Sequence, residues 1–148
     1  MESANQLIYI DTSAFYALMD RSDLHHQPAK ALWPFLLENH ITLLTCNYVV
    51  AETMKLLQFG LGFEAASLWH KAMLGVVDVH WVDQDTHRQG YELWMNLGRR
   101  HCSLVDCVSY IIMNRLQAEK AFCFKVSYAD QGFTLLPEQI FQKRQASR

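Results

Sequence analysis

Three carboxylates occupy positions where a strand-like segment gives way to a helix-like one, or where such a helix begins. Asp11 directly follows the first apolar run of the chain. Glu52 lies one turn inside the helix predicted after the apolar residues 41–45, and Asp106 opens the helix that precedes residues 120–124. Because the carboxyl ends of parallel strands share one edge of a sheet, the three acids are expected to converge there.

Converging carboxylates favour a particular chemistry. They repel one another and raise each other's pKa unless a cation neutralises them, and oxygen ligands of this kind suit Mg²⁺ or Mn²⁺. Such an ion lowers the pKa of a bound water, orients a phosphodiester and screens the charge that grows on it. The sequence therefore indicates metal-assisted hydrolysis of a phosphate ester, with Asp11, Glu52 and Asp106 as the candidate ligands.

Each acid also has a purely structural explanation. Asp11 is a helix-capping residue type at the start of a helix, and Ser103 with Asp106 has nearly the spacing of a capping box. Glu52 would be stabilised near a helix N-terminus, although the apolar residues around it suggest a position near the buried face. Both kinds of explanation stay open at the level of sequence.

Short apolar strands alternate with helices along the chain. This order predicts an α/β fold, a three-layer α/β/α sandwich around a mainly parallel sheet. A break or kink is expected at Pro34, and residues 125–130 are expected to form a loop. The predicted strands are residues 7–10, 41–45, 76–83, 120–124 and 133–137. Helices are predicted directly after Asp11 and after residue 45, and also at residues 31–36, 63–74, 84–97 and 104–117.

Length and composition suit one globular domain. The chain has 148 residues, of which 51% are hydrophobic. Residues 1–138 are expected to form a single domain, followed by a polar tail at residues 139–148. Four cysteines without a Cys-x-x-Cys pair are expected to be buried, reduced thiols. No segment has the pattern of a signal peptide or a membrane span, so a soluble cytoplasmic protein without membrane contact is expected.

Four segments carry a family resemblance: YIDTSAFYALMD, TCNYVVAETMKLL, HCSLVDCVSYIIM and AFCFKVSYADQGFTLLP, in this order over residues 7–137. The chain resembles a PIN domain of the kind found in VapC-type toxins of bacterial toxin–antitoxin pairs. The resemblance implies a metal-dependent endoribonuclease in which Asp11, Glu52 and Asp106 bind Mg²⁺ or Mn²⁺ and Ser13 or Thr12 is a nearby polar helper. It also implies a homodimer and a cognate antitoxin that covers the metal site.

Lys125 departs from the pattern of this family. PIN nucleases usually carry a fourth acid directly after the penultimate strand, where this chain has Lys125. Its ammonium could replace a second metal ion, or it could compete with the metal and leave a catalytically weakened RNA-binding or regulatory module. Asp130 is a candidate substitute acid or a turn residue. A phosphatase or DNA nuclease is a further alternative, because three acids around Mg²⁺ suit any phosphate ester.

A net charge of −2 argues against an overall electrostatic grip on nucleic acid but allows a local basic patch. Arg99 and Arg100, with His101 beside them, are candidates to bind RNA phosphates on either side of the cleaved bond. The alternative is a solvated helix end at which cations are favourable. Arg88 and Arg115 are further basic residues on neighbouring predicted helices.

The histidines and tryptophans are given structural interpretations. His25 and His26 lack matching ligands at metal-site spacing and are interpreted as surface residues of a loop near the substrate entrance. The tryptophans mostly fall on apolar faces and are expected in the core or an interface rather than as base-stacking platforms. A remaining exposed stripe around Phe59, Phe63 and Trp69 is a candidate surface for a partner helix or a second subunit.

Overall fold

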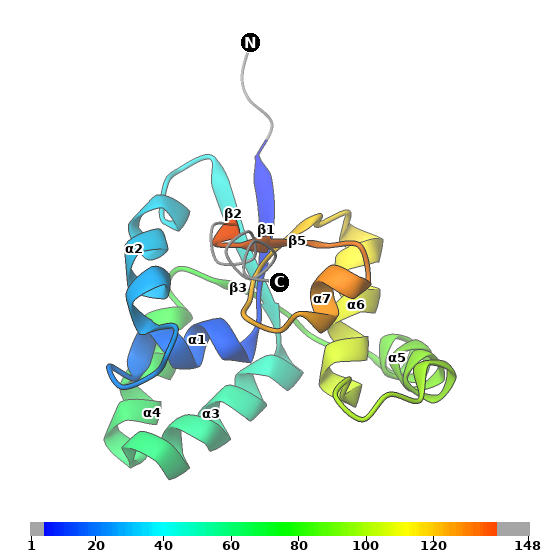
Figure 1. Ribbon diagram of the computed structural model, residues 1–148, viewed down its shortest axis with the longest axis horizontal. Helices are drawn as coiled ribbons and strands as arrows, with labels where there is room; N and C mark the ends of the chain where they lie inside the picture. The colour runs from blue at the N-terminus through cyan, green and yellow to red at the C-terminus, as the bar shows by residue number, and fades with distance from the viewer. Residues whose placement is uncertain (1–4, 139–148) are drawn as a thin grey trace, which may run out of the picture.

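A single parallel sheet organises the chain. The computed structural model describes residues 5–138 (Figure 1). Its five strands pair in the order β3-β2-β1-β4-β5, and every pair is parallel. The elements follow one another as β1 Gln6–Ile10, α1 Thr12–Met19, α2 His26–Leu36, β2 Ile41–Cys46, α3 Asn47–Leu61, α4 Phe63–Met73, β3 Asp78–His80, α5 Gln84–Leu97, α6 Leu104–Leu116, β4 Lys120–Phe122, α7 Ser127–Asp130 and β5 Thr134–Leu136.

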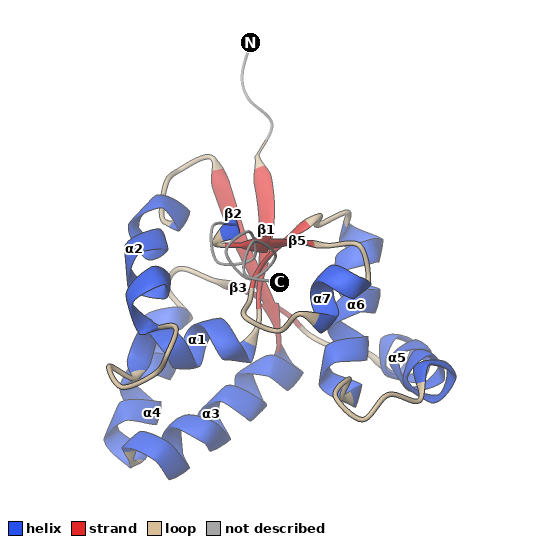
Figure 2. Ribbon diagram, in the orientation of Figure 1, coloured by secondary structure: helices blue, strands red, loops and turns tan. Residues whose placement is uncertain are grey.

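Helices cover both faces of this sheet. Figure 2 shows the strands between one group formed by α1 to α4 and another formed by α5 to α7. Strand β1 lies in the middle, and its residues Ile8, Tyr9 and Ile10 are all buried. A strand covered on both faces requires a continuous apolar run rather than an alternating one, which explains its sequence. The predicted three-layer α/β sandwich is confirmed.

Several predicted elements differ from the structure, and among them β4 ends at Phe122 rather than at residue 124 and α2 begins at His26 rather than at residue 31. Strand β3 covers only Asp78–His80, not residues 76–83, because it pairs with β2 alone and β2 gives way to α3 after Cys46. Residues 125–130, expected as a loop, contain the short helix α7, which is too short to show a helical period in the sequence. Pro34 lies inside α2, which continues to Leu36. The predicted tail at residues 139–148 lies outside the described residues.

The tryptophans divide between interior and surface. Trp69 is buried and packs edge-on against Phe15, with ring centroids 5.0 Å apart. Trp81 is 74% exposed, because it follows the last paired residue of β3, and Trp94 is 40% exposed on α5. Trp69 therefore lies in the core, whereas Trp81 and Trp94 are not core residues, and an interface role for these two stays a prediction. Trp69 does not belong to the exposed stripe predicted with Phe59 and Phe63.

The cysteines are buried, and no helix of the described residues suits a membrane span. Cys46, Cys102, Cys107 and Cys123 are all buried free thiols, as expected. Among the helices within residues 5–138, none combines the length and the apolar character needed to cross a membrane.

Helix α5 packs closely on α6, the helix that carries Asp106. A Cβ atom added at Gly90 would lie 2.5 Å from Cγ2 and 3.1 Å from Cα of Val108, so the glycine permits this close approach. We predict that Gly90→Ala lowers the free energy of unfolding by about 1–3 kcal/mol, because the two helices must separate. Urea unfolding measures the effect, with Gly75→Ala as the control because its Cβ would meet only Ala72 O at 3.6 Å. Equal stability of Gly90→Ala and the parent protein would contradict this account of the packing.

Candidate active site

Asp11 is held by donors from two distant parts of the chain. It ends the buried strand β1, and its backbone N–H donates to Phe122 O at the end of β4. Its Oδ2 accepts from the Ser13 N–H at 3.0 Å and from Ser13 Oγ at 2.7 Å, and its Oδ1 accepts from Tyr128 Oη at 2.9 Å. The residue is 1% exposed. Its carboxylate is therefore fixed in one orientation at the carboxyl edge of the sheet.

Asp106 is fixed by a capping box at the start of α6. The Asp106 N–H donates to Ser103 Oγ at 3.1 Å, and the Ser103 N–H donates to Asp106 Oδ2 at 3.0 Å. Asp106 Oδ2 also accepts a hydrogen bond from Lys125 Nζ, and the carboxylate is 1% exposed. The structural explanations of Asp11 and Asp106 as helix caps are thus correct. Capping orients each carboxylate without preventing a second role.

Glu52 lies on α3 and faces the same region as Asp11. Both residues line a cavity of about 370 Å³, the Asp11 cavity, to which Lys125 also contributes. Burial raises the pKa of Glu52 and a hydrogen bond with the Thr12 side chain lowers it, while the negative charges of Asp11 and Asp106 raise it and the positive charge of Lys125 lowers it, with a net upward shift. The other lining residues are Thr12, Ser13, Tyr16, Asp23, His25, Leu56 and Phe124.

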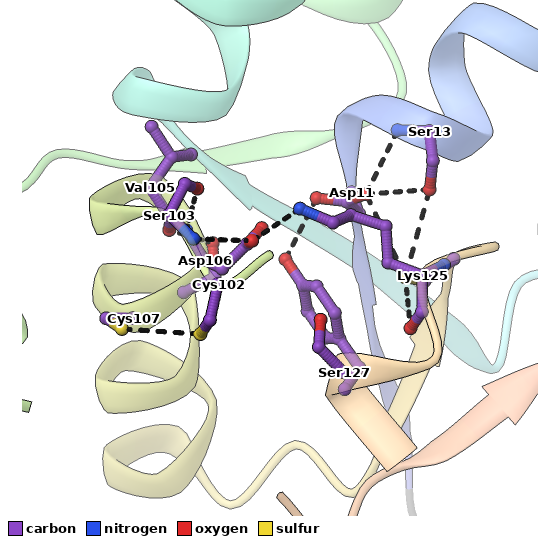
Figure 3. A network of polar contacts seen from close by, with 12 residues as sticks. Asp11, Ser13, Cys102, Ser103, Val105, Asp106, Cys107, Lys125 and Ser127 are labelled. Carbon is purple, nitrogen blue, oxygen red and sulfur yellow. Dashed lines mark hydrogen bonds and ion pairs between the residues drawn. The ribbon is translucent and has the colours of Figure 1, made fainter. Parts of the chain in front are cut away.

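Lys125 lies among the acids. Figure 3 shows its side chain extending from the loop after β4 to Asp106, with its ammonium between Asp106 and Asp11 in this view. Burial lowers the pKa of Lys125, but the hydrogen bond to Asp106 and the charges of Asp106, Asp11 and Glu52 raise it by more. The ammonium is therefore a fixed positive charge in this cluster.

The acids supply ligands of a suitable kind for a divalent cation. Among residues 5–138, no three acidic, histidine or cysteine side chains lie close enough to form a ready metal-binding group. Mg²⁺, however, usually retains several waters and binds proteins through one or two carboxylates. Asp11 and Glu52 on the wall of one cavity provide such oxygen donors, and Asp106 is paired with Lys125. The donor set thus fits Mg²⁺ or Mn²⁺, and a closed cage of three acids is not needed.

A second cavity adjoins the first at Lys125. This Arg99 cavity has a volume of about 500 Å³. Asp130 lies 3.9 Å from Arg99, on the side of Lys125 away from the Asp11 cavity, which does not favour it as a substitute for the fourth acid. The cavity is lined by Arg99, Arg100, His101, Cys102, Lys125, Val126, Ser127 and Asp130. Arg99 and Arg100 therefore line a cavity that shares Lys125 with the cavity of Asp11 and Glu52.

The remaining basic residues are engaged elsewhere. Arg88 and Arg115 both pair with Asp85, at 2.6 Å and 2.8 Å, and Arg88 also pairs with Glu92. Neither arginine lines the Asp11 cavity or the Arg99 cavity. Their positive charge is therefore largely neutralised within the α5–α6 pair, and we do not include them in the candidate site.

Comparison with known proteins finds relatives that are similar to this chain in sequence and in fold. No family model matches it. It is 31% identical over 128 residues to the 23S rRNA-specific endonuclease VapC20 of Mycobacterium tuberculosis, an alignment that covers 86% of this chain and 95% of the relative. The crystal structure of that toxin, described as cleaving the sarcin–ricin loop, superimposes with a TM-score of 0.78 over 85% of this chain and 95% of the other. The protein belongs to the VapC family.

Two more distant structures share the fold of this VapC-family protein. VapBC2 from Rickettsia felis, solved with a DNA fragment from its promoter, has a TM-score of 0.67 and 11% identity, and the match covers 88% of this chain and 97% of the other. PAE2754 from Pyrobaculum aerophilum has a TM-score of 0.63 and 13% identity, with 99% and 100% covered. At these identities the likeness supports the fold alone.

Ser13 and Thr12 differ in their contacts. Ser13 Oγ donates to Asp11 and accepts the N–H of Phe124 at 3.0 Å, so it connects the acid to the segment after β4. The Thr12 hydroxyl is buried and accepts from Thr53 Oγ1 at 3.1 Å, which ties α1 to α3. Ser13 is therefore the better candidate for the polar helper of this VapC-family site.

Sequence reasoning missed two residues at the site, Tyr128 and Phe124. Tyr128, which is buried and donates to Asp11, lies in α7, where a loop was expected. His25 lines the Asp11 cavity and stacks on Phe124, while His26 is buried with Nδ1 2.7 Å from Ala17 O. The interpretation as a surface residue is wrong for His26, which is buried, whereas His25 is half-buried and lines the Asp11 cavity. No local signal pointed to Phe124, which lies two residues beyond the end of β4 and inside the segment predicted as strand 120–124.

We predict that Glu52→Gln stabilises the metal-free protein near neutral pH. Since the pKa of Glu52 is raised by folding, its contribution favours the folded state at low pH and is lost as the pH rises through the folded pKa. Removing the charge should raise Tm by roughly 1–3 °C at pH 7. The difference should shrink as the pH falls to about 4.

Thermal unfolding in EDTA measures this effect, with the exposed Glu119→Gln as the matched control. A second readout is the stabilisation by Mn²⁺, which should be smaller in Glu52→Gln than in the parent protein because a proposed ligand is lost. A Tm of Glu52→Gln below that of the parent protein at pH 7 would show that the Glu52 carboxylate is satisfied by the fold itself.

Proposed function

We propose that this VapC-family protein is a metal-dependent endoribonuclease that hydrolyses RNA phosphodiester bonds and acts as the toxin of a toxin–antitoxin pair. The observation that carries the proposal is the arrangement around Lys125, with Asp11 and Glu52 in one cavity and Arg99 and Arg100 in the adjoining one. The similarity to VapC20 over most of both chains supports an RNA substrate.

In this proposal Asp11 and Glu52 hold Mg²⁺ or Mn²⁺, and Asp106 contributes from the start of α6. When bound, the cation supplies an activated water and screens negative charge on the phosphate. Ser13 and Tyr128 keep the Asp11 carboxylate in position through their hydrogen bonds. These contacts favour one fixed geometry of a buried acid.

The basic residues have a complementary role. Arg99 and Arg100 bind the phosphates next to the cleaved bond, since phosphate contacts set the position of the nucleic acid. Lys125 lies between these arginines and the acids, lining both cavities, and its ammonium stabilises negative charge on the phosphate undergoing reaction. The fixed charge of Lys125 is expected to support cleavage rather than to prevent it.

The test compares four substrates with Mn²⁺ and with EDTA. They are an RNA hairpin with the sarcin–ricin loop sequence, a mixed RNA pool, single-stranded DNA of the same sequence and a small phosphomonoester. We expect cleavage of RNA alone, within a loop, and dependent on metal. Cleavage of DNA or of the phosphomonoester at a similar rate would favour the alternative nuclease or phosphatase. RNA binding without cleavage in any metal would favour the weakened RNA-binding module.

The proposed partners are a cognate antitoxin and a second copy of this chain. Phe59 and Phe63, at the junction of α3 and α4, are each 75% exposed, and Leu61 between them is also exposed. Large apolar side chains gathered on a surface are typical of protein–protein contacts. Sedimentation of the purified chain tests the dimer, and a monomer at all concentrations tested would contradict it.

A further inference from the structure

A stacked pair of aromatic rings forms part of the wall of the Asp11 cavity. The rings of His25 and Phe124 are nearly parallel, with centroids 4.4 Å apart and an interplanar angle of 4°. Both side chains are half-buried and both line the cavity together with Asp11. Phe124 in turn meets the edge of Phe122 at 6.0 Å. Two segments that lie about 100 residues apart thus place two stacked aromatic rings on the cavity wall beside the acids.

Hydrogen bonds hold this surface in place from both sides. The N–H of His25 donates to Asp23 Oδ1 at 2.8 Å, and the neighbouring His26 ring bonds to Ala17 O at 2.7 Å. The N–H of Phe124 donates to Ser13 Oγ at 3.0 Å, and Ser13 Oγ donates to Asp11 Oδ2 at 2.7 Å. Two hydrogen bonds therefore connect the backbone of the ring pair to the acid itself.

The charges around the two cavities differ in sign. The Asp11 cavity contains three carboxylates, those of Asp11, Asp23 and Glu52, whereas the Arg99 cavity contains Arg99 and Arg100 with one carboxylate, Asp130, and the ammonium of Lys125 lines both. A flanking phosphate is favoured on the arginine side and is repelled by the carboxylates on the other side. An uncharged planar group is the ligand that fits beside carboxylates against a flat aromatic wall.

We propose that His25 and Phe124 form a stacking platform for an unpaired nucleobase next to the cleaved phosphate, an inference that rests on the proposed ribonuclease function. Unpaired bases of loops are splayed out and stack on aromatic side chains. Such a contact accepts every base, with a modest preference for the bases that stack more strongly. Because Lys125 follows Phe124 directly in the chain, the base on the platform belongs to a nucleotide adjacent to the phosphate near Lys125. His25 and Phe124 are thus specificity-determining residues.

The experiment combines protein variants with RNA from which single bases are removed. Fluorescence anisotropy in EDTA measures binding of a sarcin–ricin loop hairpin and of versions with one abasic nucleotide at each loop position in turn. For the wild-type protein, removal of one particular base should weaken binding about 10-fold. His25→Ala should weaken binding of the intact RNA by a similar factor. Removal of that same base should then cause no further loss of binding in this variant.

Two variants control for indirect effects. His25→Phe keeps a stacking ring and should retain the response to base removal, and the exposed His40→Ala should behave as the wild-type protein. Thermal unfolding of each variant identifies any loss of folding. Equal responses of His25→Ala and wild-type protein at every abasic position would overturn the platform, as would the absence of any position at which base removal weakens binding.

Cleavage with Mn²⁺ separates this inference from the function on which it rests. If the wild-type protein cuts the hairpin but His25→Ala responds to the removal of every base as the wild-type protein does, the ribonuclease is supported and the platform is refuted. If His25→Ala removes the response to one base but the protein does not cut under any metal, the nuclease is refuted, while the platform stands as part of an RNA-binding module. A wild-type protein that neither binds the RNA in EDTA nor cuts it with Mn²⁺ would refute both.

Discussion

Asp11→Asn is expected to lower RNA cleavage at least 10²-fold and to weaken Mn²⁺ binding, while the protein remains folded. Asp11 is a proposed metal ligand, and replacing one carboxylate oxygen by an NH₂ group removes the negative charge that attracts the cation. The fold should tolerate the change within about 1 kcal/mol, because asparagine caps helices about as well as aspartate. Cleavage rates, calorimetric titration with Mn²⁺ and thermal unfolding measure the three effects.

The matched control for this prediction is Asp78→Asn, because Asp78 is exposed at the start of β3 and lines neither cavity. It should leave cleavage and Mn²⁺ binding unchanged. If Asp11→Asn retained cleavage within 10-fold of the parent protein, Asp11 would be a helix cap and nothing more. The metal site would then have to be sought elsewhere in the chain.

Lys125→Met is expected to have opposite effects on stability with and without metal. Removing the ammonium leaves the buried Asp106 carboxylate without its partner, which is costly in a protein interior. The Lys125 side chain is 37% exposed, so solvent screens the pair and we expect a loss of about 1–2 kcal/mol in EDTA. Mn²⁺ should stabilise Lys125→Met more than the parent protein, because the metal no longer competes with the ammonium for Asp106.

Cleavage separates the two roles considered for Lys125. If its charge stabilises the phosphate during reaction, Lys125→Met should be about 10²-fold slower at saturating Mn²⁺, even though it binds the metal more tightly. Lys125→Asp should be slower still. The exposed Lys71→Met is the control. Faster cleavage by Lys125→Asp than by the parent protein would show instead that the lysine inhibits a site that once held a fourth acid.

Much of the fold follows from local sequence patterns. The apolar run before Asp11 identifies the central strand, since only a strand covered on both faces lacks polar alternation. The spacing of Ser103 and Asp106 identifies the start of α6, and its capping box is present. These features depend on residues a few positions apart. Strand β3 was predicted too long because its end is decided by its partner β2, which the local pattern does not contain.

The candidate site was predictable in outline but not in its contacts. Asp11 and Glu52 were expected near each other and line one cavity, whereas Asp106 is paired with Lys125 and does not line that cavity. The hydrogen bond from Tyr128 to Asp11 spans 117 residues, and that from Lys125 to Asp106 depends on the path of a loop. No periodicity in the sequence contains such information.

The central claim is that this VapC-family protein cuts RNA with a metal bound by its acids. The most direct measurement is cleavage of an end-labelled sarcin–ricin loop hairpin by the purified protein, in parallel with Mn²⁺ and with EDTA. We expect defined fragments with Mn²⁺, none with EDTA, and none from Asp11→Asn under either condition. Intact RNA with Mn²⁺, or the same fragments with EDTA and from Asp11→Asn, would contradict it.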